Sequence, residues 1–268
     1  MNHLLRSLAP ISDAGWKLLD EEARERLTGA LAARKLVDFA GPLGWEHSAT
    51  NMGRAAQVEG TPCEGVDAAQ RSVLPLVELR SDFSLSRDEL RAGDRGAEDV
   101  DLESLDESAR RIARAENIAV FHGFTPAGVV GITEASSQDP VRLSEDFDAY
   151  PGDVAKAVEQ LRRVGIAGPY GLALGTGPYT GVIESTEHGG YLVFDHLGKI
   201  LDGPIVWAPG VEGAVVLSQR GGDFLFESGQ DLSLGYDSHD GDAVRLYLEE
   251  SFSFRVATAE AAVALTAG

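Results

Sequence analysis

Residues 220–256 read RGGDFLFESGQDLSLGYDSHDGDAVRLYLEESFSFRV, a run in which apolar and polar side chains largely alternate. The strictest alternation places apolar residues at Val244, Leu246, Leu248, Phe252, Phe254 and Val256. A period of two puts such side chains on one face of a β-strand. The turn-forming residues 238–241, Ser-His-Asp-Gly, come just before them. This part of the chain therefore predicts strands with one buried face, entered through a turn.

Three amphipathic helices are predicted toward the amino terminus. The first follows Ser12, which can cap it, and its apolar residues recur at steps of three and four as far as Leu31. The second covers about 102–117 and continues into the apolar run 118–121, and the third covers 153–164. Short buried strands are predicted at 172–174, 205–207 and 214–217. The fold class is therefore α+β.

Between Lys35 and Pro75 the helical period disappears, and glycine and proline interrupt the chain repeatedly. A connection of this length without regular structure is unusual unless it is functional or reaches a neighbour. It contains no cluster of catalytic residue types. Val73, Val77 and Leu79 share one parity and predict a strand, which Pro75 confines to a sheet edge or a strand end.

The composition excludes several classes of protein. The chain has 268 residues, a net charge of −20 and 43% hydrophobic residues, which fits a globular protein that folds without cross-links. The single cysteine, Cys63, excludes an intramolecular disulfide framework and a multi-cysteine zinc site. The acidic balance opposes nucleic-acid binding over a broad surface. No window resembles a membrane span or a signal peptide, so we expect a soluble, cytoplasmic protein.

Candidate catalytic or ligand-binding residues are few. The segment 171–177, Gly-Leu-Ala-Leu-Gly-Thr-Gly, lacks the spacing of a nucleotide-binding loop and is interpreted as a connection between a strand and a helix. Glu184, Glu187 and His188 lie in a glycine-flanked loop, 183–190, and could bind a cation or act as acid and base. A solvated loop is the simpler interpretation unless many copies converge. No nucleophile has a base motif, so the sequence predicts no catalytic, cofactor-binding or metal-binding residue and no enzyme.

A set of short motifs, weak singly, occurs in one order along nearly the whole chain: Leu8-Ala-Pro10, Arg34-Lys-x-Val-Asp38, Gly41-Pro-x-Gly-Trp45, Gly168-Pro-Tyr170, Arg220-Gly-Gly-Asp-Phe224, Gly229-Gln-Asp-Leu-Ser233, Gly235-Tyr236 and Val244-Arg-Leu-Tyr247. That order resembles the encapsulin (linocin) family of bacterial nanocompartment shell proteins. The stretches Ile205-Val-Trp-Ala-Pro209 and Thr258-Ala-Glu-Ala261 resemble the actinobacterial branch most.

The resemblance implies the tailed-phage capsid fold, with a peripheral domain, an axial domain and an extended loop. Residues 1–48 would form the amino-terminal helix and the start of the peripheral domain, and 49–71 the extended loop that pairs with a neighbouring subunit. Residues 72–134 would carry the long spine helix. The axial domain would cover 135–221, and 222–268 would return to the peripheral domain.

The resemblance also implies function. An icosahedral homo-oligomer of about 60 copies would enclose a cargo enzyme, a dye-decolourising peroxidase or a ferritin-like iron oxidase. These cargoes are linked to oxidative stress and iron storage, and each is held by its carboxyl-terminal targeting peptide. The docking residues would be Leu27, Leu31, Arg34, Asp38, Phe39, Leu232 and Leu234. The fivefold pore would be lined by Glu184, Glu187, His188, Gly189 and Gly190, which would favour cations.

Two other classes remain open at this stage. The chain itself could have protease or bacteriocin activity, or it could be a plain phage-type capsid, although its negative charge opposes an interior filled with nucleic acid. Some encapsulins bind flavin at a Trp in the segment matching 84–90. This chain has Arg87 there, so no flavin is predicted.

Overall fold

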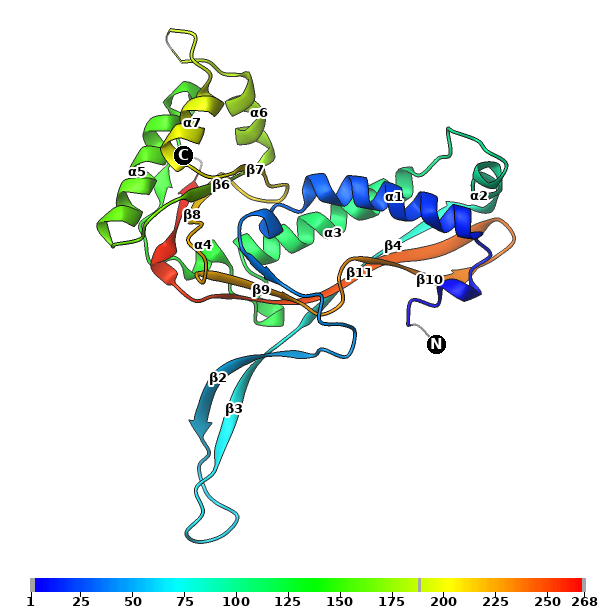
Figure 1. The fold of residues 1–268 in the computed structure, drawn as a ribbon, viewed down its shortest axis with the longest axis horizontal. Helices are drawn as coiled ribbons and strands as arrows, with labels where there is room; N and C mark the ends of the chain where they lie inside the picture. The colour runs from blue at the N-terminus through cyan, green and yellow to red at the C-terminus, as the bar shows by residue number, and fades with distance from the viewer. Residues whose placement is uncertain (1–2, 188, 267–268) are drawn as a thin grey trace.

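The computed structural model describes residues 3–187 and 189–266, which form two lobes and a long projecting arm (Figure 1). The first lobe carries two long helices on one sheet, and the second surrounds another sheet with shorter helices. The arm leaves the first lobe and extends away from both. The described chain begins beside the first lobe and ends in the second.

The sheet of the first lobe is organised around one long strand. Its members are β1 (Asp38–Ala40), β4 (Val77–Ser86), β9 (Phe224–Ser228), β10 (Ser233–His239) and β11 (Ala243–Val256). Along one edge β11 pairs antiparallel with β4, and along the other it pairs first with β10 and then with β9. The two alternating segments of the sequence are thus a single strand of 14 residues. β1 extends the sheet parallel to β9.

Two long helices, α1 (Asp13–Ala30) and α3 (Glu103–Phe121), pack on this sheet as their periodicity predicts. The Ser12 hydroxyl caps α1 by accepting a hydrogen bond from the Gly15 amide at 2.9 Å. Leu19 and Leu105 are fully buried where these helices meet the sheet. A short helix that the periodicity did not indicate, α2 (Arg87–Asp94), follows β4.

The second lobe contains a sheet in the order β5-β12-β8-β6-β7. These strands are β5 (Val141–Arg142), β6 (Tyr170–Leu174), β7 (Ile205–Trp207), β8 (Ala214–Ser218) and β12 (Ala262–Thr266). The helices of this lobe are α4 (Ile132–Ala135), α5 (Tyr150–Arg163), α6 (Thr176–Glu184) and α7 (Val193–Leu201). The predicted strands at 172–174, 205–207 and 214–217 are confirmed, and the loop after β6 does join a strand to a helix. The last strand, β12, also belongs to this sheet.

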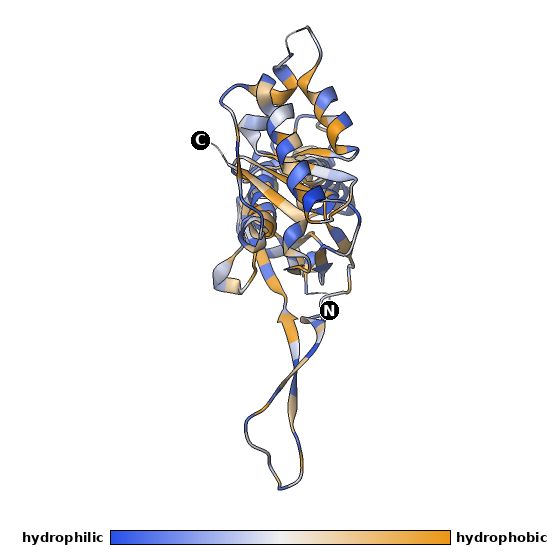
Figure 2. Ribbon diagram, turned by 90° about the vertical axis from the view of Figure 1, so that its left-hand side faces the viewer, coloured by the Kyte–Doolittle hydropathy of each residue, from blue (hydrophilic) through white to orange (hydrophobic). Residues whose placement is uncertain are grey.

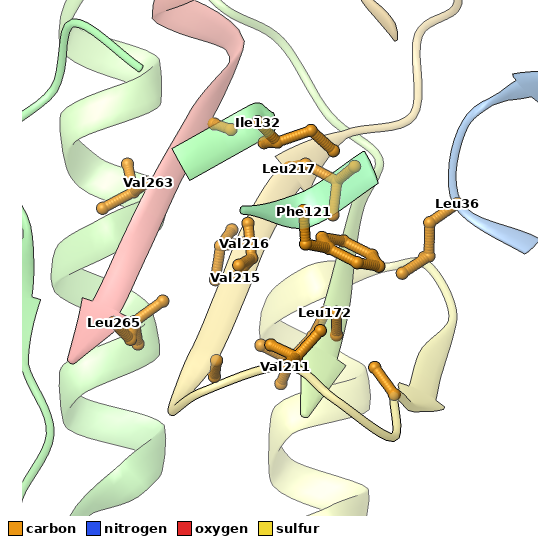
Figure 3. Close-up of a cluster of buried hydrophobic side chains, with 14 of the residues drawn as sticks. Leu36, Phe121, Ile132, Leu172, Val211, Val215, Val216, Leu217, Val263 and Leu265 are labelled. Atoms are coloured by element: carbon orange, nitrogen blue, oxygen red, sulfur yellow. The ribbon is translucent and has the colours of Figure 1, made fainter. Parts of the chain in front are cut away.

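The core of the second lobe continues to the end of α3. Figure 3 shows Val215, Val216 and Val263 on neighbouring strands, with Phe121 from α3 beside Leu217. These side chains belong to one buried cluster that also includes residues of the first sheet. The two lobes are therefore packed through shared apolar side chains.

The arm is a two-stranded antiparallel ribbon made of β2 (Ala49–Gln57) and β3 (Ala69–Pro75). The irregular excursion expected from the sequence is thus a regular hairpin, although Pro75 does end a strand as predicted. Most of its residues are exposed, so neither face packs on the chain's own core and no apolar period results. Figure 2 shows hydrophobic and hydrophilic residues mixed along it. At its root, Glu227 of β9 accepts hydrogen bonds from His47 at 2.7 Å and Thr50 at 2.6 Å.

Neither a membrane-spanning helix nor a metal-binding cluster occurs in the described part of the chain. Within residues 3–187 and 189–266, no helix is long and apolar enough to cross a bilayer. The same residues contain no group of three or more His, Cys, Asp or Glu side chains placed to hold a metal ion.

Candidate functional site

A groove of about 380 Å³ opens in the first lobe between α1 and the turn that leads into β10. Four separate parts of the chain form its walls: the segment before α1, α1 with the turn after it, the residues around the start of β10, and Leu248 of β11. Five of the seven predicted docking residues line it, namely Leu27, Leu31, Arg34, Leu232 and Leu234. The fold thus brings together residues that lie about 200 positions apart.

The apolar residues of the groove divide into two kinds. Leu27 and Leu234 are 7% and 3% exposed and pack within the core of their own lobe. Leu31 and Leu232 are only partly buried and lie against that core. Leu27 and Leu234 therefore form a floor, whereas Leu31 and Leu232 keep apolar surface that another molecule could cover.

The segment before α1 closes the groove on a third side. The Leu4 carbonyl accepts a hydrogen bond from the Tyr236 amide at 2.9 Å, which attaches this segment to β10. The Arg6 guanidinium donates two hydrogen bonds to Asp20, at 3.1 and 2.7 Å, and stands 4.1 Å from the centre of the Trp16 ring. Arg6 and Asp20 also line a second hollow of about 740 Å³ next to the groove.

Arg34 is the charged centre of the groove wall. Its guanidinium donates to Glu116 on α3 at 2.7 Å, to Glu250 on β11 at 2.7 Å and to Asp231 at 2.5 Å. Burial alone would lower the pKa of Arg34, but the three carboxyl groups outweigh it and raise that pKa further above its usual range. The guanidinium stays charged and fastens the turn after α1 to α3 and to the sheet.

The other two predicted docking residues, Asp38 and Phe39, lie on β1 and do not line the groove. Asp38 accepts a hydrogen bond from the Gly222 amide at 2.6 Å, so one carboxylate oxygen holds a turn of its own chain. The Phe39 ring stacks on Phe226 with 5.4 Å between centroids, and its centre lies 5.1 Å from the Arg34 guanidinium carbon. Phe39 therefore borders the Arg34 cluster and is 37% exposed.

The predicted pore residues lie far from the groove, at the tip of the second lobe between α6 and α7 (Figure 1). The loop expected at 183–190 begins later, because Glu184 is the last residue of α6 and is exposed. Glu187 instead pairs with His196 of α7, with 2.8 Å between Oε1 and Nδ1.

The rest of this tip is a tight turn. Gly189 and Gly190 are exposed and adopt φ values of +116° and +80°, which glycine tolerates best. The Gly190 amide donates to the Glu187 carbonyl at 2.9 Å. His188 lies outside the described residues. Glu184 forms no ion pair with another described residue, whereas Glu187 does.

Comparison with known proteins places the chain in a family. A family model described as "Encapsulating protein for peroxidase" matches residues 1–253. The chain belongs to the encapsulin family. The type 1 encapsulin shell protein of Rhodospirillum rubrum is 48% identical over 99% of this chain and 96% of its own length. That of Mycobacterium tuberculosis is 42% identical over 99% and 100%.

Solved structures place the fold of this encapsulin among capsid proteins. The virus-like particle protein of Pyrococcus furiosus matches with a TM-score of 0.65 and 18% identity, over 93% of this chain and 98% of that one. The capsid of an empty GTA particle matches with a TM-score of 0.53 and 14% identity, over 89% and 90%. The predicted family and capsid-like fold are confirmed. These relatives are named as shell proteins and not as enzymes, in agreement with the prediction from the sequence.

The partners of Arg34 were missed from the sequence, although a signal for two of them was present. Glu116 follows Ile112 by four residues and so falls on the apolar face of α3. Glu250 has the same parity as Leu248 and Phe252 in β11. A glutamate at a position that the period reserves for an apolar side chain indicates a buried, paired charge.

Proposed function

We propose that this encapsulin chain assembles into a closed icosahedral shell that encloses an enzyme in the cytoplasm and admits small solutes through its pores. The enclosed enzyme is of the peroxidase or ferritin-like class, and its carboxyl-terminal tail occupies the groove beside α1. The observation that carries the proposal is the groove itself, because five residues from distant parts of the chain meet in one hollow.

The chemistry of the groove suits a short peptide with apolar side chains. Leu31 and Leu232 offer partly exposed apolar surface, which would be removed from water by leucine-like side chains of a tail. Asp231 at the rim keeps 43% of its side chain exposed and can bind a basic group of the tail. Asp38 contributes from β1, outside the groove, through the carboxylate oxygen that does not hold Gly222.

The division into domains is part of the proposal. Residues 135–221 form an axial domain whose tip meets its copies around the fivefold axis, and residues 49–71 form the extended loop that reaches a neighbouring subunit. The remaining segments, 1–48, 72–134 and 222–268, form the peripheral domain that carries the groove, with one correction: the last strand, β12, pairs with β5 and β8 of the axial segment. The isolated position of the arm and the remote tip of the second lobe support this division.

Replacing Leu31 by Asp is expected to empty the shell without opening it. The change puts a carboxylate into the apolar wall of the groove, where an approaching leucine side chain would leave it desolvated and unpaired. Cargo that co-purifies with the native shell and is identified by mass spectrometry should fall by at least about tenfold, since the expected cost is about 1.4 kcal/mol or more.

Leu43→Asp is the matched control. Leu43 is 52% exposed and does not line the groove, so this variant should keep its cargo. Removing the carboxyl-terminal tail of the identified cargo should reproduce the loss. Equal cargo in the Leu31→Asp and native shells would refute the docking assignment.

Glu184→Gln is expected to slow the entry of metal cations into loaded shells. Several copies of an exposed carboxylate around one axis raise the local concentration of cations, and a charged entrance of this kind changes entry rates by about tenfold or more. Entry is measured as the rate at which added Fe²⁺ or Mn²⁺ reaches a metal-sensing dye attached to an enclosed protein.

Glu159→Gln serves as the control for charge alone, because Glu159 is exposed on α5 and 68% of its side chain is accessible. The Glu184→Ala/Glu187→Ala double variant removes both carboxylates of the predicted pore. Unchanged cation entry in both Glu184 variants would remove this tip as the cation path.

A further inference from the structure

Two glutamates are buried side by side behind the groove. Glu116 on α3 is 0% exposed and Glu250 on β11 is 2% exposed. Both meet the same cation, since Arg34 Nε lies 2.7 Å from Glu116 Oε2 and Arg34 Nη2 lies 2.7 Å from Glu250 Oε2. Asp231 is the third carboxylate on this guanidinium. One positive charge therefore faces three acidic groups in a site that is largely closed to water.

The remaining oxygens of the two glutamates lack donors. Glu116 Oε1 and Glu250 Oε1 are both buried, and neither has a hydrogen-bond partner among the described residues. Nε and Nη2 belong to the same guanidinium, so the Glu116 and Glu250 oxygens that accept from them lie beside each other. A hydrogen bond between two carboxyl groups requires a proton on one of them. A single added proton would therefore supply the missing donor.

The electrostatics of the pair agree with this geometry. Burial raises the pKa of Glu250 well above its usual value, the neighbouring Glu116 raises it further, and Arg34 offsets only part of the effect. Burial also raises the pKa of Glu116, against the opposing attraction of Arg34. Such a pair loses its protons in two steps that belong to the pair, and the second step is shifted to higher pH.

We propose that Glu116 and Glu250 share one proton at neutral pH, and that loss of this proton in alkaline solution loosens Arg34 and the groove wall that it holds. The charged groups at the site are Arg34 from the turn after α1, Glu116 from α3, Glu250 from β11 and Asp231 before β10. The inference rests on the proposed function only where it gives the groove a role in docking.

The direction of the effect follows from linkage. A carboxyl group with a raised pKa in the folded chain contributes stability that is complete below its unfolded pKa and is lost as pH rises through the folded value. Above that pH two buried carboxylates repel each other beside a single guanidinium. Opening of the segment around Arg34 exposes the pair to water, so it should become about tenfold more frequent for each pH unit between the ordinary carboxyl pKa and the raised pKa of the pair, and should level off above it.

The variant Glu250→Gln distinguishes the effect of the shared proton from the effect of side-chain packing. The amide keeps the shape of a neutral glutamic acid, donates a hydrogen bond to Glu116 and cannot ionise. Infrared spectra of native shells at pH 7 should contain the carbonyl band of a buried protonated carboxyl group, and Glu250→Gln shells should lack it. Glu98→Gln, an exposed change far from the cluster, should keep the band.

Hydrogen exchange of intact shells measures the consequence. After correction for intrinsic exchange rates, the protection of residues 30–38 in the native protein should fall by about tenfold per pH unit as the pH rises toward the second ionisation of the pair, and should level off beyond it. In Glu250→Gln it should stay constant over the same range. Absence of the infrared band, or an equal fall in both proteins, overturns the proposal. Neither measurement needs cargo, so a failure of the docking function would appear only in the Leu31→Asp comparison.

Discussion

Shortening the arm is expected to abolish shell formation while leaving the body folded. In the variant, residues 53–71 are replaced by Asn-Gly, so that Met52 and Ser72 flank a two-residue turn next to the Asn51–Val73 pair. The root contacts of Thr50 and His47 with Glu227 are retained. Electron microscopy and size-exclusion chromatography should show hollow particles for the native chain and small species for the variant.

The arm contributes little to the stability of its own subunit, so its loss should affect assembly and not folding. A two-stranded ribbon is marginal in water without a further partner. Val58, Val66 and Val73 are 45%, 49% and 53% exposed, and such surface is stabilised when a neighbouring copy covers it. Circular dichroism and the thermal midpoint of the body should therefore change little.

Two further variants separate the effect of the apolar surface of the arm from the effect of shortening it. Val58→Asp/Val66→Asp leaves the backbone of the arm intact and should weaken assembly in the same direction. Cys63→Ala at the exposed tip should assemble normally. Closed particles formed by the shortened chain would show that the arm is dispensable.

Arg34→Met is expected to cost the folded chain about 3–5 kcal/mol, the largest loss for any single side chain considered. The substitution keeps an unbranched apolar side chain but removes the only cation that contacts Glu116 and Glu250 in the described structure. An uncompensated buried charge then remains against α3 and the sheet. The measurement is the denaturant midpoint followed by tryptophan fluorescence at fixed protein concentration.

The triple variant Arg34→Met/Glu116→Gln/Glu250→Gln should recover most of the loss, because the uncompensated buried charge of the glutamate pair is gone. The denaturant midpoint of Arg34→Lys should lie between those of the native chain and Arg34→Met, since a single ammonium group cannot match the three contacts of the guanidinium. Arg95→Met, at an exposed arginine, gives the reference for loss of a surface charge. If Arg34→Met and Arg95→Met have the same midpoint, the cluster does not stabilise the fold.

Much of the fold was predictable because local periods and packing agree. The apolar faces of α1 and α3 and the alternation in β11 each follow from spacing alone. The arm could not be assigned as a hairpin in this way, because a ribbon without a buried face leaves no period in the sequence. α7 does carry a helical period, with Val193, Leu197 and Leu201 buried at steps of four, but it was missed because it is only nine residues long.

The groove was predictable only through family resemblance. Leu27 and Leu31 carry the spacing of any core helix, and nothing in their period identifies a docking surface. Leu232 precedes β10, which pairs with β11, and β11 pairs in turn with β4, a strand far away in the sequence. The Arg34 cluster, in contrast, could be predicted from Glu116 and Glu250, because each occupies a position where the pattern predicts an apolar side chain.

The position of β12 has a consequence for synthesis of the chain on the ribosome. Ala262–Thr266 lies between β5 and β8 in the second sheet, although it is the last strand to be made. A chain emerges with its amino terminus first, so the arm is exposed long before this sheet can close. β5 has no other strand to pair with in the described sheet until β12 arrives. The second sheet of a subunit is therefore complete only after β12 has left the ribosome, well after the arm has appeared.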